Sequence, residues 1–135
     1  MLLIEFHALG RRLKNGPRIL YFTYKLFYRF LVCRYYSVDF PLEVKVGAGL
    51  KIHHGYGLVV HPRAIIGNNV VLRHATTIGN DGRSDAAPVL EDSVDVGAGC
   101  LILGKVCIGE GAVIGAGSIV TKSVEKRSIV IQKRA

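Results

Sequence analysis

The sequence predicts a mainly β fold, a parallel solenoid of six-residue repeats that follows a short α-helical segment. Between Val46 and Val120, aliphatic residues recur every six positions, with one step of eight from Leu58 to Ile66 and a polar gap after Ile78. A small or aliphatic residue often follows four positions later, as at Val70, Thr76, Val94, Cys100, Val106, Ala112 and Ser118. A period of six matches neither a helix nor an alternating strand, but it is typical of a solenoid whose unit is one short strand and a corner.

Each part of the repeat has a physical reason. The branched residue that begins a unit points inward and stacks on its counterparts in neighbouring coils. The residue four positions later must be small because it also points into a narrow interior. Glycine and asparagine, as in Gly67-Asn68-Asn69, tolerate the backbone that the corners require. The alternative, a glycine-rich antiparallel sandwich, would need alternating strands with turn signals every 8–12 residues, which the six-residue period does not match.

Residues 1–37 form the predicted helical segment. Residues 1–14 predict a short helix, and Pro17 suits the first position of a second helix that runs to about Tyr36. Apolar residues recur along the second helix at three- and four-residue steps, with basic residues on the opposite face. They are Leu20, Tyr24, Phe27, Leu31 and Tyr35. The helix is too charged and too short to cross a bilayer. Two interpretations stay open: this stripe packs on the solenoid or a neighbouring subunit, or residues 17–36 lie on a membrane surface facing anionic lipid.

Composition and charge narrow the class of protein. The 135 residues suit one domain, and the formal net charge is +8. Most of this charge lies in the first quarter of the chain, so the repeats are nearly neutral, which argues against nucleic-acid binding along the solenoid. The three cysteines form no CxxC pair, and Cys100 is expected to fill the core. Without an evident cleavable signal, a reducing, cytoplasmic setting is expected.

The hexads resemble the left-handed parallel β-helix of the hexapeptide-repeat acyltransferases, an exception to the right-handed rule for parallel crossovers. The resemblance implies a β-helical acyltransferase domain over residues 38–125, with a loop thrown out of the coil at residues 80–87. Family members usually continue through a Gly-Asn-Pro-Ala type turn into a cap. Here Gln132-Lys133 stands at that place, so residues 126–135 are expected to form a truncated or frame-altered tail.

One segment carries the chemistry. Residues 46–59, which contain adjacent histidines, resemble the serine acetyltransferase segment that reads roughly I-G-x-G-[IL]-x-[LI]-D-H-A-x-G-[IV]-V. The match places His54 on the catalytic histidine and Asp39 on the aspartate that pairs with it. A hydroxyl needs a base to take its proton as it attacks a thioester, and a carboxylate can orient that base. The resemblance implies no covalent intermediate, so no cysteine is assigned as a nucleophile.

The resemblance also implies acetyl-CoA as donor, no metal, and a homotrimer in which the pantetheine arm lies between adjacent subunits. Small residues keep such a groove open. Ala98 and Ala116, each between two glycines, match groove positions, and Gly79-Asn80 matches the turn near the thioester. Lys122 is a candidate contact for the 3′-phosphate.

The acceptor is predicted to be a saccharide. Serine acetyltransferases carry an Arg-His pair that helps to hold the amino acid, and Ala86 and Ala87 occupy those positions here. Loss of this charged clamp argues against a small zwitterionic acceptor. The remaining pattern more closely resembles short acetyltransferases of colanic-acid and capsule synthesis, with His53 or His74 as an acceptor contact. Serine O-acetylation for cysteine synthesis stays open as the alternative.

Two other classes of β-helix protein fit the repeats less well. A zinc β-helix of the γ-carbonic-anhydrase kind uses three histidines that bridge subunits, but no histidine follows His74 to supply the closely spaced second and third ligands. A catalytically inactive β-helix scaffold would bind no CoA. The matched Asp39 and His54 would then be a coincidence.

Overall fold

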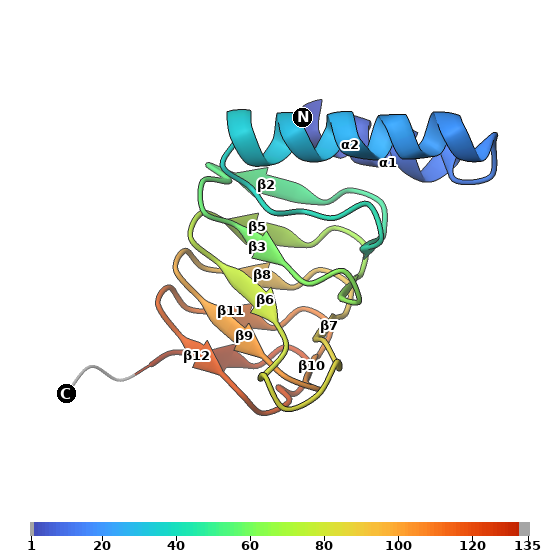
Figure 1. The fold of residues 1–135 in the computed structure, drawn as a ribbon. Coiled ribbons are helices and arrows are strands. Elements are labelled where there is room, and N and C mark those ends of the chain that lie inside the picture. The colour runs from blue at the N-terminus through green and yellow to red at the C-terminus, as the bar shows by residue number, and fades with distance from the viewer. Residues whose placement is uncertain (1, 133–135) are drawn as a thin grey trace.

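The structure, a computed structural model, describes residues 2–132. Its central feature is a parallel β-helix whose coils pass in turn through three narrow sheets (Figure 1). Sheet A has the strand order β12-β9-β6-β3, sheet B the order β1-β4-β7-β10, and sheet C the order β13-β11-β8-β5-β2. The strands are β1 Lys45–Val46, β2 Lys51–His53, β3 Val59–Val60, β4 Ile65–Ile66, β5 Val71–Arg73, β6 Thr77–Gly79, β7 Val89–Leu90, β8 Asp95–Val96, β9 Leu101–Leu103, β10 Cys107–Ile108, β11 Val113–Ile114, β12 Ile119–Val120 and β13 Ile129–Val130. The predicted solenoid is confirmed.

The interior consists of side chains stacked coil on coil. In sheet A the register pairs Val60 with Ile78, Ile78 with Ile102, and Ile102 with Val120. All four side chains are almost fully buried, as are the small residues predicted to point inward. Each large aliphatic side chain removed from water stabilises the fold by about 1.5–3 kcal/mol. The thin core therefore gains its stability from many equivalent stacks.

One detail of the predicted register is wrong. The sequence placed the step of eight after Leu58, whereas the structure pairs Val60 with Ile78 and Val59 with Thr77. Leu58 is fully buried, but it precedes the strand. The longer step therefore runs from Ile52 to Val60, through the corner after β2. Leu58 and Val60 are both aliphatic, so the sequence alone did not distinguish them.

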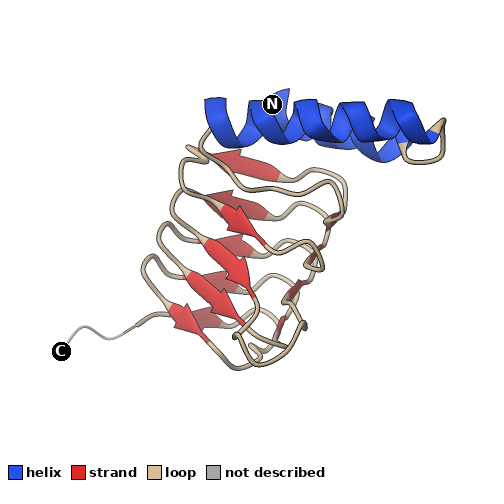
Figure 2. Cartoon of the chain, in the orientation of Figure 1, coloured by secondary structure: helices blue, strands red, loops and turns tan. Residues whose placement is uncertain are grey.

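Two antiparallel helices, α1 (Leu2–Leu13) and α2 (Arg18–Tyr35), lie across one end of the solenoid (Figures 1 and 2). Polar contacts fix them to the first coil. The hydroxyl of Tyr28 donates to the carbonyl of Phe40 at 2.8 Å, and Nε2 of buried His7 lies 3.2 Å from the carbonyl of Pro41. The imidazole also packs edge-on against Phe40, with ring centroids 5.1 Å apart. The two predicted helices are confirmed.

Within the single chain, the predicted stripe of α2 packs on the solenoid only in part. The buried residues of α2 are Tyr28 and Val32, whereas Leu20, Phe27 and Tyr35 of the predicted stripe are 48%, 54% and 81% exposed. The helix carries apolar residues on more than one face, so the three- and four-residue spacing did not single out the face that packs. None of the helices within residues 2–132 has the length and apolar character to span a bilayer.

The last coil extends further than the sequence suggested. Strand β13 pairs with β11, and Val124 forms a bridge with Ile108, so the described solenoid continues to Val130, past the predicted boundary at residue 125. The step from Val120 to Val124 is shorter than six, which hid the continuation. Part of the predicted tail, residues 133–135, lies outside the described residues.

Candidate active site

His54 lies on a corner that is longer than its counterparts. Elsewhere along this edge, six residues separate stacked positions, as from Leu72 to Ile78, but eight separate Ile52 from Val60. The hydrogen bond from Ala75 N to Tyr56 O aligns Tyr56 with His74, which identifies His54 and Gly55 as the two additional residues. His54 has a φ of +50°, a left-handed conformation that a residue with a Cβ rarely adopts.

The insertion exposes the imidazole at a hollow. His54 lines a cavity of about 460 Å³ together with Tyr56 of the same corner and with Tyr35 and Tyr36 at the end of α2. The inserted corner therefore presents the imidazole ring to an open cavity lined by tyrosines instead of to the interior.

Asp39, the predicted partner of His54, lies in a neighbouring hollow. It forms a parallel bridge with Val59 at the start of the solenoid. Its cavity, of about 360 Å³, is also lined by Arg29 and Cys33 of α2. Within residues 2–132 the side chains of Asp39 and His54 are joined by no hydrogen bond or ion pair. Their backbones are close: Asp39 N donates to Leu58 O at 2.8 Å, and Leu58 N donates to Gly55 O at 3.0 Å.

His74 belongs to a column of corner residues between sheets C and A. Backbone hydrogen bonds from Ala75 N to Tyr56 O, from Gly99 N to His74 O, and from Gly117 N to Ala98 O link successive coils at 2.8–3.0 Å. They stack four residues in register, which we call the corner column: Tyr56, His74, Ala98 and Ala116. The structure thus brings together the predicted acceptor contact His74 and the predicted CoA contacts Ala98 and Ala116, with His54 just before the first member.

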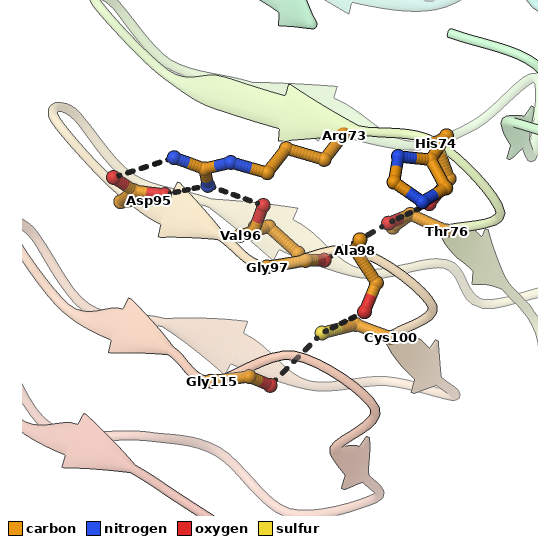
Figure 3. Close-up of polar contacts among 9 residues, drawn as sticks. All are labelled: Arg73, His74, Thr76, Asp95, Val96, Gly97, Ala98, Cys100 and Gly115. Atoms are coloured by element: carbon orange, nitrogen blue, oxygen red, sulfur yellow. Dashed lines mark hydrogen bonds and ion pairs between the residues drawn. The ribbon is translucent and has the colours of Figure 1, made fainter. Parts of the chain in front are cut away.

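A polar network supports this column from behind (Figure 3). The hydroxyl of Thr76 donates to the carbonyl of Gly97 at 3.2 Å, and the thiol of Cys100 donates to the carbonyl of Gly115 at 3.2 Å. Both side chains are fully buried. They satisfy carbonyls of the glycines that precede Ala98 and Ala116, so the inward small residues also set the position of the column.

Arg73 is a site neighbour that the sequence analysis did not single out. In Figure 3 its guanidinium reaches the Asp95 carboxylate, and it donates to the carbonyl of Val96 at 2.9 Å. His53, the other predicted acceptor contact, pairs with Arg73 in the register of sheet C. His53 is therefore the last residue of β2 and directly precedes the inserted corner. Its neighbour in the sheet is Arg73, which already forms an ion pair with Asp95. The adjacency of Arg73 to His74 in the sequence was the available signal.

The remaining predicted CoA residues lie along the other edge of sheet A. The loop over residues 80–87 leaves the coil after Gly79, whose carbonyl accepts from Gly104 N at 2.9 Å. Asn80 follows directly, and Lys122 is exposed two coils further on. In a single chain, sheet A thus separates these residues from the corner column. The loop itself is tied to the solenoid by an ion pair between Arg63 and Asp85 at 3.1 Å.

The cysteines are poorly suited to nucleophilic chemistry. Desolvation is the largest cause that raises the pKa of each thiol, at Cys33, Cys100 and Cys107. A raised pKa keeps these groups as thiols at neutral pH, and the thiolate is the reactive form. Within a single chain, residues 2–132 bring no three His, Cys, Asp or Glu side chains together in a way that could hold a metal ion.

Comparison with known proteins shows which family the chain belongs to. No protein-family model matches it. It is 32% identical over 109 residues to WcaB of Escherichia coli, a protein named for acetyl transfer in colanic acid biosynthesis, and the match covers 80% of this chain and 67% of WcaB. The chain belongs to the serine acetyltransferase-like hexapeptide-repeat acetyltransferases. It is also 41% identical over 98 residues to mitochondrial serine acetyltransferase 3 of Arabidopsis thaliana, covering 71% of this chain but 25% of that one.

Solved structures of this acetyltransferase family have the same fold. Soybean serine acetyltransferase complexed with serine matches with a TM-score of 0.85 and 33% identity, over 98% of this chain and 54% of the other. The Brucella abortus enzyme in complex with coenzyme A matches with a TM-score of 0.84 and 32% identity, over 98% and 52%. The left-handed β-helix class is confirmed. The chain spans about half the length of these solved relatives.

Proposed function

We propose that this protein transfers an acetyl group from acetyl-CoA to a sugar hydroxyl in the synthesis of a surface polysaccharide, with His54 as general base. The observation that carries the proposal is the inserted corner. It places His54 at an open hollow and at the head of the column that contains His74, Ala98 and Ala116. The match to WcaB over 80% of the chain supports a saccharide acceptor.

The reaction requires one proton to move twice. Neutral His54 accepts the proton of the acceptor hydroxyl as the oxygen attacks the thioester carbonyl. The carbon–sulfur bond breaks, and the imidazolium returns the proton to the departing CoA sulfur, so that the products are an ester and a free thiol. General acid–base catalysis of this kind contributes about 10²–10⁴-fold. Asp39 would orient the imidazole, and their side chains would close together when the acceptor is bound, since catalytic hydrogen bonds often tighten only in the complex.

The donor groove is proposed to form between copies. Ala98 and Ala116 are small and lie on one edge of sheet A, while Gly79, Asn80 and Lys122 lie on the other. One pantetheine arm cannot follow both edges of the same sheet. A homotrimer with the C–A edge of one copy beside the A–B edge of the next would unite the two sets around a single acetyl-CoA.

The acceptor and its setting follow from the loop and the helices. Ala86 and Ala87, which replace a charged pair in the serine-specific relatives, are half-buried beside Pro88 and offer no counter-charge to a zwitterion. A saccharide needs none. A lipid-linked sugar would also explain a membrane contact through residues 17–36, at the cytoplasmic face. Serine remains the second candidate because serine acetyltransferases are among the relatives.

Free-thiol release from acetyl-CoA tests the proposal, with serine and with nucleotide- and lipid-linked sugars as acceptors. His54→Ala should reduce turnover at least about a hundredfold and leave CoA affinity unchanged. Glu110→Gln is the control, because Glu110 is exposed at the corner after β10, away from both edges of sheet A. Wild-type turnover in His54→Ala would remove His54 from the mechanism. Release with serine alone would identify a serine acetyltransferase. An absence of both release and CoA binding would favour a scaffold.

A further inference from the structure

The outer face of α2 is an apolar surface that the fold does not cover. Ile19, Phe22, Leu26 and Phe30 are 81%, 62%, 57% and 68% exposed. They recur at three- and four-residue steps, so they form one stripe along the helix. We call these four residues the outer stripe. It lies opposite Tyr28, through which α2 packs on the first coil. A contiguous apolar stripe of this kind marks an interaction surface.

Basic side chains border the outer stripe on both sides. At 100° per residue, Arg18 and Arg29 fall on one flank and Arg34 on the other. All three are exposed, and α2 contains no acidic residue. Lys25 differs, because it forms an ion pair with Glu43 of the first coil. The border is therefore cationic without a compensating charge on its own helix.

A hollow at the beginning of the stripe combines both properties. It is a shallow, largely open depression where α1 passes into α2, lined by Lys14, Arg18, Ile19, Tyr21 and Phe22. Two cationic side chains thus face the same space as two members of the outer stripe. This combination suits a phosphate headgroup whose acyl chains continue along apolar side chains.

We infer that the outer stripe docks α2 in the plane of an anionic lipid bilayer. An interfacial helix inserts its apolar face by a few ångströms while basic residues contact anionic headgroups. The position of α2 permits this, because it lies across the end of the solenoid (Figure 1) and the outer stripe is on the side opposite Tyr28, which packs on the first coil. A second copy of the chain is a poorer occupant, since face-to-face pairing of two outer stripes would bring the borders with Arg18, Arg29 and Arg34 against each other.

Docking would place the active corner close to the lipid. Tyr35 and Tyr36, at the end of the same helix, line the hollow of His54. A bilayer held against the outer stripe would therefore lie within one helix diameter of that hollow, where a lipid-linked sugar would present its hydroxyl. This consequence for the acceptor rests on the proposed function, whereas membrane binding itself does not. Either can fail separately in an experiment.

Flotation of the full chain with vesicles tests the inference. Wild type should float with phosphatidylcholine vesicles that contain about 30% phosphatidylglycerol and stay unbound with pure phosphatidylcholine, because each basic residue near an anionic surface strengthens binding by roughly fivefold. Arg18→Gln with Arg34→Gln should weaken binding by roughly thirtyfold. Lys45→Gln with Lys105→Gln removes the same charge from exposed positions outside α2 and should bind as wild type does.

A second variant separates the apolar contribution from the charge. Leu26→Glu with Phe30→Glu alters only exposed positions, so the fold should persist, and binding should be lost. Thiol release with a water-soluble acceptor is measured in parallel, so that failure of the proposed chemistry is distinguished from failure of docking. The inference would be overturned if the wild-type protein did not bind anionic vesicles, or if the Leu26→Glu, Phe30→Glu variant still floated with them. A Glu variant whose particle mass falls without vesicles would assign the stripe to contact between copies and would also overturn it.

Discussion

Gly97→Ala should weaken CoA binding without contacting CoA itself. A Cβ added at Gly97 would lie 2.5 Å from the backbone nitrogen of Ala116, 2.7 Å from its Cα and 2.8 Å from the carbonyl oxygen of Ile114. Ordinary van der Waals contact begins at 3.4 Å. All three neighbours are backbone atoms, so no side chain can rotate away, and the coil that carries Ala116 must move.

The size of the effect follows from that displacement. Overpacking of a well-packed interior costs about 1–3 kcal/mol, so the fold should persist with a lower unfolding midpoint. The movement shifts Ala116 within the corner column by several tenths of an ångström or more. Displacements of about 1 Å at a binding constellation can cost roughly a hundredfold. We therefore expect CoA affinity to fall by at least about tenfold.

Gly111→Ala is the matched control. It lies at the corner after β10, away from the corner column, and a Cβ there would contact only the side chain of Arg127, at 3.4 Å. Its φ of +68° makes alanine unfavourable by about 1–2 kcal/mol. The two variants should thus lose similar stability, while only Gly97→Ala moves the column. Calorimetric titration with CoA, at a temperature below the unfolding midpoints of both variants, compares their affinities for CoA. Thermal unfolding compares their stabilities. Equal CoA affinity in Gly97→Ala and wild type would refute the assignment of the corner column to the donor groove.

Three further predictions concern stability. Burial is the main cause that lowers the pKa of His7, so the unfolded chain binds a proton more readily than the folded one. Stability should therefore hold above the ordinary histidine pKa of about 6.5 and decline as the pH falls below it, and His7→Gln should flatten a thermal-unfolding series between pH 5 and 8. Leu72→Ala, at a fully buried stack, should cost about 2–5 kcal/mol in denaturant unfolding, and an unchanged midpoint would contradict the stacked core. Tyr28→Phe should cost about 1–3 kcal/mol by leaving the Phe40 carbonyl unpaired, whereas exposed Tyr35→Phe should cost almost nothing.

The repeat was predictable because its physics is local. A residue such as Ile102 has one inward direction, and every coil imposes the same requirement on its counterpart. The six-residue period therefore identified the sheets and the inward positions. The helices were less predictable, since α2 has apolar residues on opposite faces. The spacing of its apolar residues did not predict that Tyr28 and Val32 face the first coil. The face that packs is determined by the hydrogen bond from Tyr28 to Phe40 and by the contact with α1.

The sequence predicted which residues belong to the candidate site better than it predicted how they are arranged in space. The resemblance identified His54 and Asp39, but the sequence did not show that their side chains line separate hollows in the single chain. It also did not single out Arg73, whose pairing with Asp95 joins residues from two successive coils. Contacts between coils depend on the register, and an error of two residues at Leu58 was enough to obscure the inserted corner.

The departures from period six coincide with the site that we propose. A perfect solenoid repeats the same backbone corner in every coil, so only the side chains distinguish one corner from the next. This chain lengthens the step between stacked residues at two places, from Ile52 to Val60 and from Ile78 to Leu90, and returns to register after each. The first lengthening carries His54, and the second follows Gly79 on the opposite edge of sheet A. No interior stack benefits from either lengthening, which supports our proposal that the site needs two edges, one from each of two adjacent copies.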